Sequence, residues 1–133
     1  MQYMLLIYGD ENALDDAQRQ ECYVKSTEYA RQLNASGHFR ATSPLHPTST
    51  ATSLRIRDGK WLVTDGPFAE KREQLGGFFL INARDLDEAI EISAKIPAAQ
   101  WGTVEVRPVV EIPGLPEASL HRTVDLAQTR STE

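Results

Sequence analysis

The residues best suited to chemistry in this 133-residue chain lie in the run Asp65-Gly66-Pro67-Phe68-Ala69-Glu70. Asp65 can exchange a proton or bind a polar group, and loops held by a scaffold often carry such functions. The same aspartate can instead fix a turn after an expected strand over 60–64, because Asp bonds readily to backbone two residues on and Gly66 tolerates positive φ. Both interpretations remain open for Asp65.

Two histidines are candidates to act with Asp65 as general acid or base. His38 follows the end of an expected helix, where a histidine can also serve as a surface cation near the helix C-terminus. His46 lies in a connection rich in Thr, Ser and Pro. The separations of His38, His46 and His121 match no local metal pattern, and no phosphate-binding or dinucleotide glycine motif occurs. We therefore expect no metal and no cofactor.

Four further residues are candidate ligand contacts. Arg55 and Arg57 share one face of an expected strand, since side chains two apart point the same way, and an arginine near Asp65 could orient a small acid in a partly apolar cavity. Phe68 is expected in the core or in a dimer seam. Glu70, like Glu73, is more typical of a solvated charge at the start of a helix.

The elements that must position these side chains follow from periodicity and turn signals. Apolar runs predict strands over 3–8 and 78–81, the first of them central in the sheet. Helical spacing predicts helices over about 14–36, ended by Gly37, and from an N-cap at Asp85 to 96. Alternating runs around Asp58-Gly59 predict a hairpin over 54–64, and a last half-exposed strand covers 103–107. This order predicts an α+β, ferredoxin-like βαββαβ-type sandwich: an antiparallel sheet with two helices on one face.

The strands over 3–8 and 78–81 are too apolar to leave their second face in water. We therefore expect a homodimer in which another copy covers that face. One domain is expected over residues 1–112. The remainder, 113–133, is expected to be a tail that is either disordered or docked on the partner subunit as a short helix over 120–126.

Composition limits the class of protein. The net charge is −5 and the basic residues are scattered, which argues against nucleic-acid binding. A single cysteine, Cys22, allows no intrachain disulfide and is typical of a cytoplasmic protein. The N-terminal apolar run is short and lacks a basic flank, so neither a signal peptide nor a membrane helix is expected.

The sequence resembles the YCII-related family, in particular its DGPF-motif branch. The resemblance rests on the Asp-Gly-Pro-Phe run with its continuation KREQLGGFFLI, and on the segments Tyr3–Tyr8, Leu86–Ala89 and Val104–Pro108. The resemblance implies a dimeric, ferredoxin-like α+β barrel. It also implies a site built on a His-Asp pair, with Asp65 as the acidic member. The helix over 14–36 holds no histidine, so His38 and His46 are substitutes by location only. Some members are encoded near extracytoplasmic-function sigma factors, which makes a sigma factor a candidate partner.

Two functions are compatible with these residues. The first is a cofactor-independent acid–base enzyme, or a degenerate enzyme, acting on a small molecule in a cleft between sheet and helices, with Asp65 at the site. The alternative is a non-catalytic dimeric module that binds a metabolite or a protein. A ligand-sized cavity within hydrogen-bond reach of the Asp65 carboxylate would favour the first.

Overall fold

The computed structural model describes residues 1–116. Its elements are β1 (Gln2–Gly9), α1 (Asp16–Ala35), β2 (Phe39–Pro44), β3 (Thr52–Arg57), β4 (Lys60–Asp65), β5 (Gln74–Asn82), α2 (Leu86–Ala94) and β6 (Thr103–Pro108). Short 3-10 turns, η1 and η2, cover Thr48–Thr50 and Pro97–Gln100. Most of the predicted tail, residues 117–133, lies outside the described residues.

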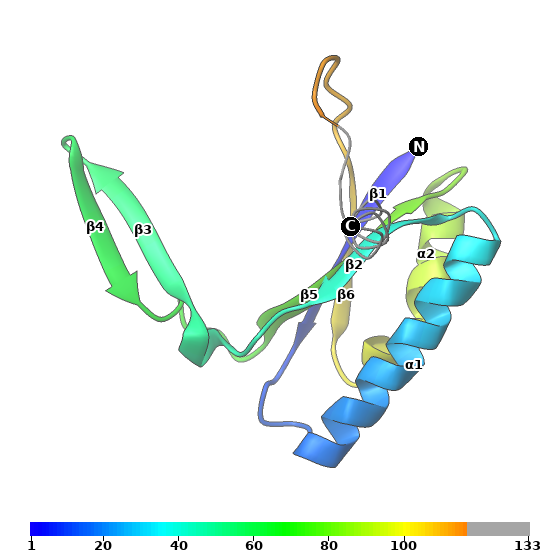
Figure 1. Ribbon diagram of the computed structural model, residues 1–133, viewed down its shortest axis with the longest axis horizontal. Coiled ribbons are helices and arrows are strands. Elements are labelled where there is room, and N and C mark those ends of the chain that lie inside the picture. Colours follow the sequence, from blue (N-terminus) through cyan, green and yellow to red (C-terminus); the bar gives the residue numbers. More distant parts are fainter. Residues whose placement is uncertain (117–133) are drawn as a thin grey trace, which may run out of the picture.

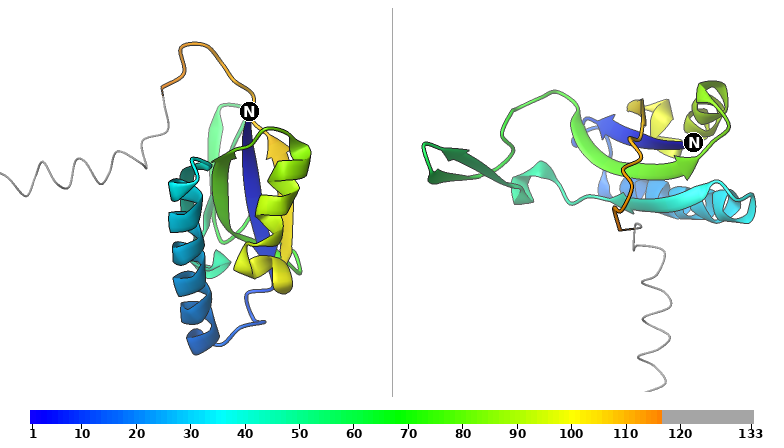
Figure 2. Two further views of the ribbon diagram at one scale, coloured as in Figure 1. Left: turned by 90° about the vertical axis from the view of Figure 1, so that its right-hand side faces the viewer. Right: turned by 90° about the horizontal axis from the view of Figure 1, so that it is seen from above.

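Four strands form an antiparallel sheet in the order β2-β5-β1-β6, with β1 in a central position as predicted. Both helices cover one face of this sheet, as Figure 2 shows. The α+β, ferredoxin-like fold predicted from periodicity is therefore confirmed. It follows from alternating strand–helix segments that bury one sheet face under two helices.

The core lies between that sheet face and the helices. Along β1, Tyr3 and Leu5 are buried, and their cross-strand partners Ile81 and Phe79 are buried beside them. The intervening side chains point to the opposite face, because successive residues of a strand alternate. The helices and the segment after α2 complete the core with Tyr29, Leu33, Ala89, Ile92, Ile96 and Ala98.

Helix α1 begins at a reciprocal cap. The Asp15 carboxylate accepts a hydrogen bond from the Gln18 backbone N–H, and the Gln18 side chain accepts one from the backbone N–H of Asp15. This arrangement satisfies two backbone donors that a helix start leaves free. Near the other end, Tyr29 donates its buried hydroxyl to the carbonyl of Ile92 at 2.7 Å, which ties α1 to α2. Burial raises the pKa of the Tyr29 phenol.

Helix α2 begins at the predicted N-cap, where Asp85 accepts a hydrogen bond from the backbone N–H of Glu88. The Glu88 carboxylate reaches back one residue further than a standard capping box and accepts a hydrogen bond from the backbone N–H of Arg84. This bond is the largest cause of a lowered pKa at Glu88, helped by the charges of Arg84 and His38 and opposed by partial burial. The ionised carboxylate therefore stabilises the start of α2.

The predicted hairpin forms as β3 and β4, and it makes its own two-stranded sheet apart from the main one. Its turn has positive φ at both Asp58 and Gly59, as a two-residue primed turn requires. We call residues 52–65 the arm. Figure 1 shows the arm projecting away from the sheet and helices.

The segment that returns from the arm to β5 differs from expectation. Residues 66–73 form no helix, so the interpretation of Glu70 and Glu73 as helix-start charges is wrong. Within the described chain Phe68 is 75% exposed and does not enter the core. Gly66 does adopt positive φ, and its backbone N–H bonds to the carbonyl of Ala51 at the base of the arm.

Candidate functional site

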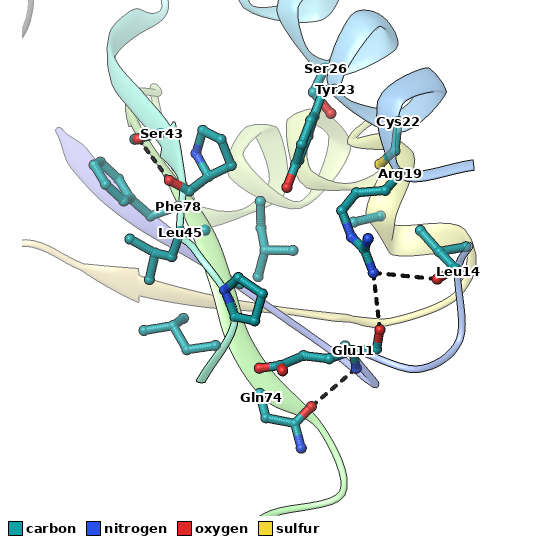
Figure 3. Close-up of a pocket in the computed structure, with 18 of the residues that line it drawn as sticks. Glu11, Leu14, Arg19, Cys22, Tyr23, Ser26, Ser43, Leu45, Gln74 and Phe78 are labelled. Atoms are coloured by element: carbon teal, nitrogen blue, oxygen red, sulfur yellow. Dashed lines mark hydrogen bonds between the residues drawn. The ribbon is translucent and has the colours of Figure 1, made fainter. Parts of the chain in front are cut away.

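A cavity of about 210 Å³ lies between α1 and the sheet (Figure 3). Its walls come from α1, from the facing strands β1, β2 and β5, and from the segment that follows β2. Most of the lining is apolar, and the larger contributors are Ile7, Leu14, Tyr23, Leu45, Pro47, Leu75, Phe79 and Trp101. A cavity of this size and lining suits one ring-sized molecule, since a site of about 150 Å³ already accepts benzene.

Hydrogen bonds fix the edge of the cavity. Glu11 is their centre, because its carboxylate accepts from the backbone N–H of Thr48 at 2.9 Å and its own backbone N–H donates to the Gln74 side chain at 3.1 Å. Arg19 donates from α1 to the carbonyls of Glu11 and Leu14, at 3.2 and 3.3 Å. Figure 3 shows the Arg19 and Gln74 bonds. Three chain segments far apart in sequence are thereby joined around one opening.

Several polar or reactive side chains line the same space. Cys22 and Tyr23 are half-buried on α1, and the Tyr23 hydroxyl points toward the strands (Figure 3). His46 lines the cavity from the segment after β2 and is exposed to solvent. A phenol and a thiol can donate hydrogen bonds to a ligand, and an imidazole can exchange its proton near neutral pH.

Trp101 closes one end of the cavity by lying against the end of β1. A methyl group at Gly9 would overlap the Trp101 ring, so glycine is needed there for the indole to occupy its place. Gly9 and Trp101 both line the cavity, and Trp101 is 38% exposed. Part of the Trp101 side chain is therefore accessible from the cavity.

Of the candidate catalytic residues, only His46 lines the cavity. Asp65 ends β4 at the base of the arm and is exposed. Within residues 1–116 no hydrogen bond or ion pair joins Asp65 to His38 or His46. The structure thus does not bring a His-Asp pair together within this part of one chain, and a catalytic role for Asp65 stays a prediction.

His38 occupies a junction between the two helices. Its Nδ1 lies 2.7 Å from the Ser36 hydroxyl and its Nε2 lies 3.2 Å from the Glu88 carboxylate. Its backbone N–H also bonds to the carbonyl of Leu33 at the end of α1. These contacts fit the helix-terminus interpretation of His38, which lies outside the cavity lining.

The four candidate ligand contacts also lie elsewhere. Arg55 and Arg57 are exposed on the arm, and Arg57 bonds to the carbonyl of Ile56. Phe68 and Glu70 are exposed in the segment between the arm and β5. None of the four lines the cavity, so their roles as ligand contacts remain predictions.

Sequence reasoning missed most of the cavity residues. Cys22 and Tyr23 fit the helical stripe of α1 and therefore looked like core residues, while Glu11, Gln74 and Trp101 come together only through strand pairing. The one local signal was His46 in its Pro-containing connection.

Two classes of feature are absent from the described part of the chain. Among residues 1–116, no three His, Cys, Asp or Glu side chains gather closely enough to hold a metal ion. None of the helices in that range is both long and apolar enough to cross a membrane.

Comparison with known proteins places this fold in a class of small ferredoxin-like α+β proteins. The family model of the YCII-related domain matches residues 1–113, and the chain belongs to this family. An uncharacterized protein of Rhizobium meliloti (strain 1021) is 36% identical over 118 residues, which cover 82% of this chain and 92% of that protein.

A solved structure shares the fold. It is 5-chloro-2-hydroxyhydroquinone dehydrochlorinase (TftG) from Burkholderia phenoliruptrix AC1100, in complex with 2,5-dihydroxybenzoquinone. The match has a TM-score of 0.51 and 15% identity, and it covers 84% of this chain and 96% of that one. At this identity the likeness concerns the fold alone.

Proposed function

We propose that the cavity under α1 binds a small ring compound with polar substituents, and that His46 moves a proton on it without a cofactor. The observation that carries this proposal is the cavity itself: about 210 Å³, mainly apolar, and edged by the one predicted histidine that reaches it. Apolar cavities with a few polar groups are the usual form of small-molecule sites. Such a protein would act in the cytoplasm, as its single cysteine indicates.

Each polar group of the cavity lining would have its own role in binding or proton transfer. The ring would lie between Trp101 and the apolar side chains of the sheet, where burial of its faces stabilises the complex. The Tyr23 hydroxyl would donate to a ring oxygen, and His46 would accept or return a proton at the open edge. The bonds of Glu11 and Arg19 hold the edge in place before the ligand arrives, which lowers the entropy cost of binding.

The solved structure of the same fold supports this choice of ligand. That protein is a dehydrochlorinase of a chlorinated hydroxyhydroquinone, seen in complex with 2,5-dihydroxybenzoquinone, so a protein of this fold acts on a hydroxylated single ring. A cavity near 210 Å³ accommodates a molecule of that class.

We further propose a homodimer formed through the sheet face that the helices leave open. On that face Met4 lies opposite Leu80 and Leu6 lies opposite Phe78, and all four are half-buried within the described chain. These four side chains form an apolar strip on the two central strands, flanked on β6 by Glu105 and Arg107, and such a strip is typical of a surface that another subunit covers.

The test of catalysis uses chlorinated and unchlorinated hydroxyhydroquinones with purified wild type and His46→Gln. We expect chloride release by the wild type, at least about 100-fold slower release by His46→Gln, and unchanged ring binding by both, because proton transfer typically contributes that factor. Binding without any turnover by the wild type would contradict the acid–base role and favour the non-catalytic module. Equal turnover by His46→Gln would exclude His46 as the proton carrier.

A further inference from the structure

The two faces of the arm differ sharply in chemistry. In the β3–β4 register Leu54 lies opposite Val63 and Ile56 lies opposite Trp61, so these four share one face. Their exposed fractions range from 53% for Leu54 to 73% for Trp61. The middle of this side of the arm is thus apolar and open to water, and Thr52 and Asp65 lie on the same side at its base.

The opposite face is basic. Arg55 lies opposite Leu62, and Arg57 lies opposite Lys60, so all three cations of the arm point away from its apolar side. The arm holds three cations and two carboxylates, which leaves eleven cations and seventeen carboxylates in the rest of the chain. The remainder of the chain therefore has a net charge of −6.

Hydrogen bonds close the base of the arm. At its base the backbone N–H of Gly66 donates to the carbonyl of Ala51 at 2.7 Å, and the Ser53 hydroxyl donates to the carbonyl of Gly66 at 2.8 Å. At its tip Asp58 and Gly59 form the two-residue turn. Figure 1 shows that this ordered hairpin lies apart from the sheet and both helices.

An isolated two-stranded hairpin is at best marginally stable in water, because nothing covers its apolar side. Within residues 1–116 the arm packs substantially only against itself. If the arm keeps this conformation, something outside residues 1–116 of the same chain must therefore supply the cover.

We propose that this cover is a second copy of the chain, onto which the arm docks through Leu54, Ile56, Trp61 and Val63. Net charge favours this occupant, because an arm of net charge +1 is attracted to a body of net charge −6 even though its three cations lie on the face turned away from the docking side. A nucleic acid or an anionic membrane would attract the basic face but repel that acidic body. The arm extends the homodimer proposed above, and this inference rests on that proposal.

The first test follows Trp61 without altering the arm. The chain has two tryptophans, so Trp101→Phe leaves Trp61 as the only one. We expect its emission to shift to shorter wavelength as the protein concentration rises through the dimerisation range measured by sedimentation, because the indole becomes buried. An unchanged Trp61 spectrum in a chain that does dimerise would overturn arm docking and leave the sheet-face dimer intact. A chain that stays monomeric would overturn both.

The second test compares matched charge additions on the two faces. We expect Ile56→Lys with Val63→Lys to raise the dimer dissociation constant at least about tenfold, as for buried interface anchors. The control, Leu62→Lys with Thr64→Lys, places the same charges on the basic face. It should change the dimer dissociation constant less than about threefold. Equal effects of both pairs would overturn the proposal. The proposal would also be overturned if the wild-type chain bound phosphatidylglycerol vesicles while neither pair of lysine substitutions changed dimerisation.

Discussion

Single polar contacts hold the site-bearing elements in place at the residue scale. Tyr29 and Glu88 each join parts of the chain that are far apart in sequence, through the carbonyl of Ile92 and through His38 respectively. His38, selected from the sequence as a candidate catalyst, takes part in this structural junction and not in the cavity lining. The residue type of His38 suits catalysis, but it does not indicate where His38 lies, because its partner Glu88 comes from another helix.

Removing the buried Tyr29 hydroxyl should destabilise the fold. Tyr29→Phe leaves the carbonyl of Ile92 without this donor, so we expect the free energy of unfolding to fall by about 1–2 kcal/mol. Urea denaturation measures this free energy of unfolding. Tyr23→Phe is the matched control on the same helix, because its hydroxyl has no hydrogen-bond partner within residues 1–116. Equal losses for both variants would contradict the assigned role of Tyr29.

Glu88 should make stability depend on pH. Because its pKa is lowered in the folded chain, first by the backbone N–H of Arg84, its contribution is fully present above the ordinary pKa of glutamate and is lost as pH falls through the lowered value. We expect Glu88→Gln to be less stable than the wild type at neutral pH, with the difference disappearing as the pH falls below the ordinary range of a glutamate pKa. Parallel urea titrations of wild type, Glu88→Gln and the exposed control Glu91→Gln measure this. A Glu88→Gln deficit that does not vary with pH would argue against it.

The helices and the strands β1, β5 and β6 of the main sheet could be predicted because each carries its own local signal, whereas β2 lies in a segment that reads as a connection. Asp85 marks the start of α2, Asp58-Gly59 marks the hairpin turn, and the apolar run of β1 marks a central strand. The cavity could not be predicted, because Glu11, Arg19 and Gln74 meet only after three elements pack together. The position of the arm could not be predicted either, since an alternating hairpin reads the same whether or not it joins a larger sheet.

The end of β1 is the element on which the shape of the cavity depends. Gly9→Ala would push the Trp101 ring from its place, so we expect a loss of about 1–3 kcal/mol in the free energy of unfolding and weaker ring binding. Gly76→Ala is a matched control for stability in a neighbouring strand, because an added methyl there meets its nearest atom, the Ile7 carbonyl oxygen, at 4.0 Å. Gly76 also lines the cavity, so this control serves for stability and not for ring binding. Urea denaturation and Trp101 emission in a Trp61→Phe background measure both effects. If Gly9→Ala were as stable as Gly76→Ala, the shape of the cavity would not depend on the packing of Trp101 against Gly9.

At the scale of the whole molecule, the chain has two apolar surfaces that its own described residues leave open: the outer sheet face and one side of the arm. We expect sedimentation velocity at micromolar concentration to give a dimer of the 14.9 kDa chain. Leu6→Glu, on the outer sheet face, should weaken that dimer, because burying an unpaired carboxylate in an apolar interface is costly. A monomer at those concentrations would contradict the covered-face argument.

The central claim is that the cavity under α1 binds a hydroxylated ring, and one titration tests it most directly. In Trp61→Phe the only tryptophan is Trp101, which lines the cavity. Addition of 2,5-dihydroxybenzoquinone, the ligand in the TftG structure, should quench Trp101 emission saturably with one molecule bound per chain. N-acetyltryptophanamide corrects for absorption by the ligand. Quenching that rises linearly without saturation, and equally for the free tryptophan derivative, would show that the cavity does not bind this class of molecule.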